Sequence, residues 1–306
     1  MAEILALAPA CKDYVWGGEN LQTRWGKNSS LSPLAECWEL SFHPDGLCMV
    51  ASGPQAGKTL CEVVTAQDIG KNAAKFPFFP VLIKFLDAKQ NLSVQVHPSD
   101  EYALQNENSF GKTEAWYILD AVDGAGIYCG FRRQMTKVEV ETAIQNGTLT
   151  DYLQFIPVKK GETYFIPSGT VHAIGAGITL CEIQQNSNLT YRVYDYGRLG
   201  ADGKPRALHV EKALSVMDFS PYRNPLFESK EEDKLLCRCA YFSAYEVDAR
   251  VTRKFQTNGD SFHAITVVDG DGWIGELPAK KGQTFFVPAG YGEYCVSGIK
   301  YILVRV

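Results

Sequence analysis

Apolar and polar side chains alternate through residues 91–98. The apolar positions are Leu92, Val94 and Val96, and the polar ones are Ser93, Gln95 and His97. A period of two predicts a β-strand with one apolar and one polar face. A hydroxyl, an amide and an imidazole on the polar face indicate a pocket rather than a solvated surface. A second polar alternation, Lys112-Thr113-Glu114, leads into an expected strand at 115–119. We interpret the two strands as walls of one pocket.

Similar patterns predict the other elements. Further strands are expected at 36–42, 80–87, 162–166, 178–184, 241–247, 262–268, 284–287 and 300–304. Short helices are expected at 59–67, 100–105, 136–152 with a break at 146–147, and 210–217. Ser99 and Thr136 are suitable N-caps, and Glu139 would complete a capping box with Thr136. The chain is therefore expected to be mainly β, with a few short helices.

An internal repeat indicates two β-domains of the same type. Residues 159–172, KKGETYFIPSGTVH, and 280–293, KKGQTFFVPAGYGE, carry Gly, Pro and Gly at the same offsets. The polar, proline-punctuated stretch from 220 to 234 is the best linker, so we predict a catalytic domain at 1–219 and a second domain at 220–306. Glu293 stands where His172 stands in the first copy, and no set like Gln95-x-His97 precedes it. The second domain is expected to keep the fold without the metal site.

The spacing around His172 is compatible with a metal site. Glycines allow tight turns, Pro167 ends a strand, and His172 would then turn into the mouth of a barrel, where ligands commonly bind. His97, Glu114 and His172 form a 2-His-1-carboxylate set, which binds a divalent ion and leaves positions open for substrate. Gln95, on the same face as His97, could supply a fourth ligand. The alternative is that each histidine is an ordinary hydrogen-bonded core residue, and the spacing leaves the two interpretations evenly balanced.

Two basic residues have competing interpretations. Arg192 could stabilise an oxyanion or hold a phosphate group, but the residues alone slightly favour a surface ion pair with Asp195. Lys112 could contact a phosphate or transfer a proton, although an isolated lysine is more often simply solvated.

Composition limits the partners. The net charge is only −5 and no basic stripe occurs, so neither nucleic acid nor an anionic membrane surface is expected to bind. The nine cysteines are scattered, which favours free thiols in a reducing cytoplasm over a disulfide framework. The N-terminal residues lack the basic region of a signal peptide, and no apolar run is long enough to span a membrane. A monomer or small homo-oligomer is expected.

Several motifs, in order, resemble the type I phosphomannose (mannose-6-phosphate) isomerases in their short bacterial form. They are VQVHPSDEY at 94–102, GKTE at 111–114, IPSGTVHA at 166–173 and EIQQNSNLTYR at 182–192. The segments WGG at 16–18 and WELS at 38–41 are similar to the N-terminal part of that family. The resemblance covers nearly the whole chain.

The resemblance implies a bicupin, with two jelly-roll barrels and the metal in the first. It also implies a zinc-dependent interconversion of mannose 6-phosphate and fructose 6-phosphate, with one ion per chain. The metal ligands of the family fall on His97, Glu114 and His172, with Gln95 as a possible fourth. The catalytic arginine falls on Arg192, and the other pocket residues are Ser93, Lys112 and Glu182. The chain departs from some relatives at Asn188, where they carry aspartate, and is too short for their inserted helical domain.

These residues support a hypothetical mechanism. A metal ion would polarise the sugar carbonyl, and a base would move a proton between C2 and C1 through an enediol. Lys112 and Glu182 are both candidates for the base, and the lysine would need a lowered pKa. Two other classes remain open at this point, a non-enzymatic sugar-phosphate-binding cupin and an iron-dependent cupin dioxygenase. An isomerase acting on a different aldose phosphate is a further alternative.

Overall fold

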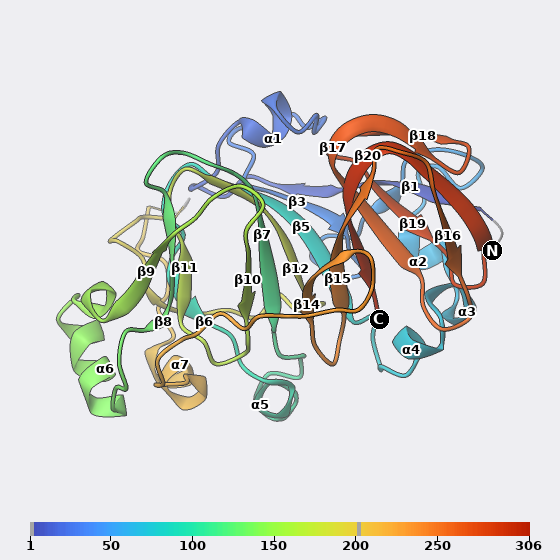
Figure 1. The fold of residues 1–306 in the computed structure, drawn as a ribbon. Coiled ribbons are helices and arrows are strands. Elements are labelled where there is room, and N and C mark those ends of the chain that lie inside the picture. Colours follow the sequence, from blue (N-terminus) through green and yellow to red (C-terminus); the bar gives the residue numbers. More distant parts are fainter. Residues whose placement is uncertain (1–2, 201–202) are drawn as a thin grey trace.

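Antiparallel strands dominate the computed structural model, which describes residues 3–200 and 203–306 (Figure 1). A six-stranded sheet contains, in spatial order, β10 (Thr163–Ile166), β7 (Glu114–Ala121), β12 (Ile178–Gln185), β5 (Val81–Ala88), β3 (Glu36–Leu40) and β2 (Ala10–Lys12). A five-stranded sheet contains β13 (Tyr191–Tyr194), β6 (Val94–Val96), β11 (His172–Ile174), β8 (Gly126–Phe131) and β9 (Leu153–Pro157). The two sheets face each other across an apolar core that includes Leu86, Ile118, Ile127 and Ile174. They form the first barrel.

The second barrel is built from a nine-stranded sheet. Its main path is β14 (Lys234–Arg238), β15 (Ser243–Ala249), β20 (Gly292–Arg305), β17 (His263–Ile274), β19 (Thr284–Val287), β1 (Leu5–Ala8) and β4 (Met49–Val50). Off this path, β16 (Arg253–Thr257) pairs with β20 and β18 (Leu277–Lys280) pairs with β17. Thus the N-terminal strand β1 lies in a sheet otherwise made mostly of C-terminal strands. The division of the chain at residue 219 stays a prediction. Strands β1 and β4 precede that residue but belong to the sheet of the second barrel.

The six-stranded sheet is covered on both faces. One face lines the first barrel, and the other packs on the second barrel through residues such as Phe85, Ile183, Phe262 and Phe286. All eight residues of β5 and all eight of β12 are buried. A strand buried on both faces need not alternate apolar and polar residues, so its charged side chains must find partners inside the protein.

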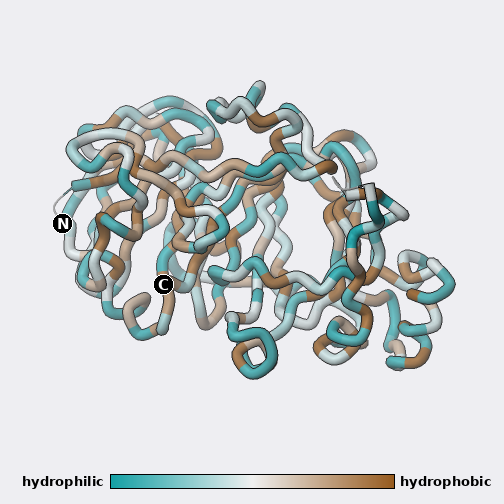
Figure 2. The backbone as a smooth tube through the Cα atoms, turned by 180° about the vertical axis from the view of Figure 1, so that it is seen from behind, coloured by the Kyte–Doolittle hydropathy of each residue, from teal (hydrophilic) through white to brown (hydrophobic). Residues whose placement is uncertain are grey.

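Helices are short and lie at the margins (Figure 1). They are α1 (Asn20–Thr23), α2 (Leu60–Val63), α3 (Ala66–Ile69), α4 (Lys71–Ala74), α5 (Asp100–Asn106), α6 (Lys137–Gln145), the 3₁₀ turn η1 (Leu149–Asp151) and α7 (Val210–Val216). In the described residues no helix is long and apolar enough to cross a membrane. Hydrophobic and hydrophilic residues alternate over short distances along the backbone (Figure 2).

The predicted caps are confirmed, whereas one predicted helix is wrong. The Ser99 side chain accepts the Tyr102 N–H at the start of α5, and Thr136 and Glu139 form the capping box of α6. The single helix expected at 59–67 is two helices, because the backbone becomes extended at Val64 and Thr65 caps a new turn. The strand expected at 300–304 is the end of the much longer β20.

The internal repeat folds into the same turn twice. Gly161 and Gly282 have positive φ angles of 87° and 89°, a conformation that glycine adopts without strain. Each donates its N–H to a carbonyl of the neighbouring strand at 2.9 Å, Ile118 in the first barrel and Val267 in the second. The repeat therefore corresponds to equivalent strands of two barrels, as the sequence predicted.

The two copies diverge at the ligand positions. In the first barrel Ile166 pairs with Glu114, and in the second the equivalent Val287 pairs with His263. His172 is buried, but Glu293 is exposed, and its neighbour Tyr294 is buried instead. The Tyr294 hydroxyl lies 2.7 Å from His263 Nδ1. The interior of the second barrel is filled by an apolar and aromatic core that includes Tyr245, Phe285 and Tyr301.

Candidate active site

Three predicted metal ligands meet inside the first barrel. His97 follows β6, Glu114 begins β7 and His172 begins β11, so three strands place them together. Glu114 Oε2 lies 3.5 Å from His97 Nε2, and Glu114 Oε1 lies 3.3 Å from His172 Nε2. All three side chains are at most 1% exposed, and their ligand atoms lie within 4.8 Å of one another.

The backbone fixes the tautomers of both histidines. His97 Nδ1 lies 2.8 Å from the Leu189 carbonyl oxygen, and His172 Nδ1 lies 2.8 Å from the Thr170 carbonyl oxygen. A carbonyl only accepts, so each Nδ1 must carry the proton, and each Nε2 presents an unprotonated lone pair to the space beside Glu114. This second hydrogen bond is the usual support of a histidine that binds metal. Lys112 Nζ lies 3.3 Å from the Nε2 of His97.

The protonation states also suit a cation. Burial lowers the pKa of His172 to about 4 and holds that of His97 well below its usual value, so both imidazoles are neutral at neutral pH. Burial raises the pKa of Glu114 to about 8, although Lys112 at 2.6 Å opposes the shift. Neither Glu114 oxygen accepts a hydrogen bond of good geometry. A divalent ion would supply the charge that this carboxylate lacks, so the set fits such an ion.

Gln95 lies beside the same space. It is directly opposite His172 in the pairing of β6 with β11, and its Nε2 is 3.4 Å from His172 Nε2. Its Oε1 accepts from the Ser93 hydroxyl at 3.4 Å. Half a turn of the amide would exchange the two atoms, so the oxygen can reach the side occupied by the ligands.

A buried row of alternating charges runs from the three ligands across the inner face of the six-stranded sheet. Lys112 Nζ is 2.6 Å from Glu114 Oε2 and 3.6 Å from Glu182 Oε1. Lys84 Nζ continues the row, 3.7 Å from Glu182 Oε2 and 3.4 Å from Glu36 Oε2. We call Glu36, Lys84, Glu182, Lys112 and Glu114 the charge row. Because acidic and basic side chains alternate along it, each member has neighbours of the opposite type.

Two tryptophans hold the carboxylates of the charge row. The Trp116 indole N–H donates to Glu182 at 3.0 Å, and the Trp38 indole N–H donates to Glu36 at 2.7 Å. Lys84 Nζ also lies 4.5 Å from the centre of the Trp38 ring, a cation–π contact. These contacts fix where the charged atoms face the cavity.

The charge row sets opposite protonation preferences for its central members. Burial alone would raise the pKa of Glu182, but Lys112 and Lys84 outweigh it and hold the pKa at about 2. Burial alone would lower the pKa of Lys112, but Glu114 and Glu182 outweigh it and raise that pKa above its usual value. Glu182 is therefore a carboxylate and Lys112 an ammonium group. The lowered lysine pKa that a basic Lys112 would need is not found in this arrangement.

Arg192 points into the site rather than to Asp195. Its Nε donates to the Ser93 hydroxyl at 3.2 Å and its Nη1 to the Ala207 carbonyl at 3.1 Å. Asp195 is bound instead by Arg198 and Arg206. The surface pair of Arg192 with Asp195, which the sequence slightly favoured, is wrong, because β13 turns residues 192 and 195 toward different neighbours.

A cavity of about 390 Å³ opens against these residues. Its polar lining includes Glu36, Lys84, Lys112, Glu182, Arg192 and His209. Ser93 and Gln95 complete the wall next to the three ligands, and Asn188 lies at the loop side, where its amide donates to Asp45 at 2.9 Å. The structure thus gathers all eight predicted site residues in one region, while their individual roles stay predictions.

Sequence reasoning missed four members of this region. Glu36 and Trp38 lie in the expected strand at 36–42 and Lys84 in that at 80–87, and neither strand alternates apolar and polar residues as residues 91–98 do. His209 lies just before α7, yet its Nδ1 accepts the Arg192 backbone N–H at 3.3 Å. A lysine within an otherwise apolar strand was the one usable signal, because a buried lysine requires a partner.

Comparisons with known proteins agree with this geometry. A family model described as phosphomannose isomerase type I, catalytic domain, matches residues 4–123, and one described as mannose-6-phosphate isomerase, cupin domain, matches residues 231–306. The mannose-6-phosphate isomerase ManA of Bacillus subtilis is 39% identical over 99% of this chain and 98% of its own length. The mannose-6-phosphate isomerase of Streptococcus mutans is 36% identical over 94% of this chain and 93% of its own length.

Solved structures extend the likeness to the fold. The crystal structure of mannose 6-phosphate isomerase from Bacillus subtilis superposes with a TM-score of 0.90 and 36% identity over 99% of both chains. A zinc-bound mannose 6-phosphate isomerase shares the fold at 17% identity, with a TM-score of 0.79 over 99% of both chains. The chain is a bicupin of the type I phosphomannose isomerase family.

Proposed function

We propose that this protein interconverts mannose 6-phosphate and fructose 6-phosphate, as an aldose–ketose isomerase. The observation that carries the proposal is the His97–Glu114–His172 set, whose unprotonated imidazole nitrogens and carboxyl group adjoin a polar cavity with both acidic and basic groups. An aldose–ketose isomerisation needs a polarised carbonyl and groups that move a proton between adjacent carbons. The names of the full-length relatives support the choice of substrate.

We assign one divalent ion per chain to His97, Glu114 and His172, with Gln95 as a possible fourth ligand. Zinc suits a set of two imidazoles and a carboxylate that keeps positions open for substrate. The zinc-bound structure of a distant relative supports the same choice. When bound, the ion would polarise the sugar carbonyl and so acidify the neighbouring C–H bond.

The charge row supplies the proton-transfer groups. Glu182, as a carboxylate, accepts a proton from the substrate carbon, and Lys112, as an ammonium group, donates one to the substrate oxygen. The low pKa of Glu182 makes it a weak base, so it depends on a carbonyl polarised elsewhere in the site. Lys84 and Trp116 hold this carboxylate ionised and in place.

Arg192 and Ser93 line the same cavity as Lys112 and Glu182. Arg192 Nε donates to the Ser93 hydroxyl, which anchors the guanidinium beside the cavity and leaves its charge available. We propose that Arg192 stabilises the oxyanion that develops on the enediol and that Ser93 hydrogen-bonds the sugar phosphate. A planar guanidinium with several donors suits this task.

We also propose that the chemistry belongs to residues 1–219, whereas residues 220–306 form a supporting domain without a metal site. The second domain buries the outer face of the six-stranded sheet, whose strands carry four members of the charge row, Glu36, Lys84, Glu114 and Glu182. The only partner proposed is a small sugar phosphate, and the protein would act in the cytoplasm as a monomer or small homo-oligomer. The free state of all nine cysteines supports a reducing compartment.

The test compares wild type with Arg192→Ala in a coupled assay for fructose 6-phosphate formed from mannose 6-phosphate. Loss of one oxyanion-stabilising donor is expected to lower kcat by on the order of 10²-fold. Arg223→Ala, in the linker and outside the active-site cavity, is the matched control and should behave as wild type. Equal turnover by Arg192→Ala and wild type would contradict the role of Arg192. No turnover by metal-loaded wild type would contradict the isomerase assignment itself.

A further inference from the structure

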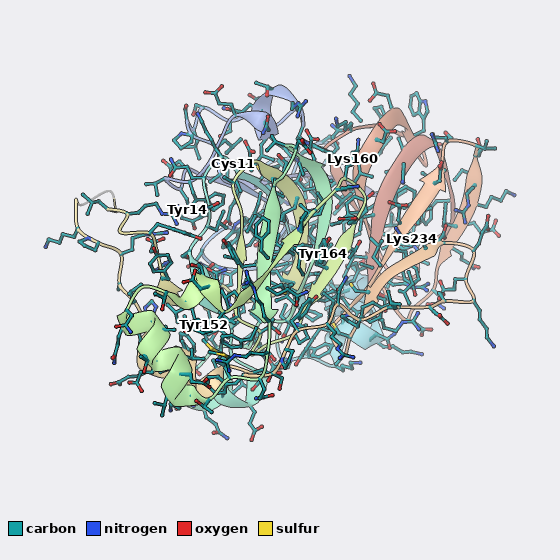
Figure 3. All side chains as sticks on the ribbon, turned by 60° about the vertical axis from the view of Figure 1, so that its left-hand side comes forward. Cys11, Tyr14, Tyr152, Lys160, Tyr164 and Lys234 are labelled. Carbon is teal, nitrogen blue, oxygen red and sulfur yellow. The ribbon has the colours of Figure 1, made fainter. Side chains whose placement is uncertain are left out.

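Two cysteines lie side by side at the edge of the six-stranded sheet. Cys11 on the edge strand β2 pairs directly with Cys37 on β3, although 26 positions separate them in the chain. Their sulfur atoms are 3.2 Å apart. Elsewhere in residues 3–200 and 203–306 no other two cysteine sulfurs are hydrogen-bonded to each other. Figure 3 labels Cys11 on the N-terminal segment that borders the first barrel.

The two thiols are chemically unequal. Cys11 is partly exposed, whereas Cys37 is fully buried. The hydrogen bond between the two sulfurs lowers the pKa of Cys11 to about 7, against the opposing effect of burial. The same contact, together with burial, raises the pKa of Cys37 well above its usual value, so Cys11 is the thiolate of the pair and Cys37 the thiol. A thiolate that solvent can reach, with a second thiol beside it, is the arrangement of an attacking and a resolving cysteine.

The other cysteines provide contrasts. Burial raises the pKa of Cys48 to about 12 and holds that of Cys181 well above its usual value, so neither offers the thiolate that attacks a peroxide. Cys61 and Cys295 are exposed, but neither has a cysteine as a cross-strand partner. Exposure, thiolate character and a second sulfur therefore coincide at Cys11.

The pair is mechanically connected to the active site. On β3, the neighbours of Cys37 are Glu36, which lines the cavity, and Trp38, which donates to Glu36. On β2, Lys12 lies 5.1 Å from the Trp38 ring centre and donates to the carbonyl of Asp45. A change in the spacing of β2 and β3 would therefore move one end of the charge row.

We propose that Cys11 and Cys37 form a reversible disulfide under peroxide stress and that the disulfide lowers the isomerase turnover. The Cys11 thiolate attacks hydrogen peroxide and becomes a sulfenic acid, with loss of hydroxide. The Cys37 thiol then displaces the sulfenic oxygen as water, which forms the S–S bond. The peroxide is reduced by two electrons while the two thiols are oxidised by two. A small dithiol restores both cysteines by exchange.

The bond requires a small movement of the strands. Directly opposed residues of antiparallel strands have Cβ atoms about 4.5–5.5 Å apart, whereas a disulfide holds them at about 3.8 Å. The strands must therefore approach by on the order of 1 Å. A misplacement of that size in a catalytic group lowers the rate by up to about 10²-fold. Glu36 contacts Glu182 only through Lys84, so we expect turnover to fall by on the order of tenfold.

The experiment follows two readouts during titration of the metal-loaded protein with hydrogen peroxide. Mass spectrometry of a non-reduced digest detects the cross-linked peptides, and the coupled isomerase assay detects turnover. The expected result is a Cys11–Cys37 cross-link that rises as turnover falls on the order of tenfold, with both reversed by dithiothreitol. Cys11→Ser should keep full turnover at the same peroxide dose, whereas the exposed-cysteine control Cys61→Ser should respond as wild type.

Three results would overturn the inference. They are a peroxide-treated protein without the cross-link, a complete cross-link with unchanged turnover, and equal inactivation of Cys11→Ser and wild type. The turnover readout rests on the proposed isomerase function. The cross-link does not, so a protein that forms the disulfide but never isomerises mannose 6-phosphate would contradict the proposed function separately.

Discussion

Replacing Lys84 by methionine removes one charge from the charge row and nearly preserves the side-chain volume. Lys84 Nζ lies 3.7 Å from Glu182 Oε2, and both groups are about 4% exposed. At an effective dielectric constant near 20, a unit charge at this distance contributes roughly 4 to 5 kcal/mol, which equals about 3 pKa units. The pKa of Glu182, now about 2, is therefore expected to rise toward about 5 in the variant.

The sign of the pH effect follows from the form of Glu182 that accepts a proton. Only the carboxylate is active, so activity is lost as pH falls through the Glu182 pKa. In wild type this loss lies near pH 2, below the pH range of the measurement, whereas in Lys84→Met it should move to about pH 5, with little change at pH 8. The measurement is kcat/KM for mannose 6-phosphate from about pH 4.5 to 8.

Lys89→Met is the matched control. Lys89 follows the same strand as Lys84 but is exposed and does not line the active-site cavity, so its acid limb should match that of wild type. Circular dichroism at each pH separates an altered pKa from unfolding. An acid limb of Lys84→Met that superimposes on wild type would refute the assignment of Glu182 as the ionised group that Lys84 supports.

Three further changes test other parts of the structure. His172→Ala removes a ligand whose Nε2 faces Glu114, so bound metal and turnover should both fall at least about tenfold with the circular dichroism unchanged; retention of both would contradict the ligand set. The Thr136 backbone N–H and Arg133 lower the pKa of Glu139 to about 2, so the ionised side chain stabilises α6 at pH values above its unfolded pKa of about 4.3, and this stabilisation is lost as pH falls through 2. The urea midpoint of Glu139→Gln should therefore lie below that of wild type at pH 7 and meet it near pH 2. A difference in midpoint that stays constant with pH would contradict this account. The buried Phe262 ring stacks on Phe286 between the two barrels, so Phe262→Ala leaves a cavity there and should lower the free energy of unfolding in urea by about 3–5 kcal/mol. A loss below about 0.5 kcal/mol, as for a surface substitution, would contradict this packing.

The polar alternation in the sequence was sufficient to place much of the site. Gln95 and His97 face the same side because the side-chain period of a strand is two, and the repeat placed His172 in the turn that follows another expected strand. The sequence also predicted the capping box of Thr136 with Glu139, because it depends on residues three positions apart. Each of these features is encoded locally.

Features that depend on remote pairing could not be predicted. Strands β8, β9, β11 and β13 are short and are held by partners far along the chain, so their own sequences carry weak signals. β1 pairs with β19, more than 270 positions away, and nothing within its four residues specifies that partner. Lys84 and Glu36 appeared to belong to an apolar core because the sheet that holds them is buried on both faces.

The most direct test is a metal-dependent isomerase assay on the whole chain. Turnover of mannose 6-phosphate is measured on the purified protein, after removal of metal by a chelator, and after titration with zinc, with bound metal determined on the same samples. The proposed function predicts loss of turnover on chelation and recovery that reaches its maximum at one zinc ion per chain. Full turnover by metal-free protein would contradict the metal-assisted mechanism, and no turnover in the zinc-loaded protein would contradict the isomerase function.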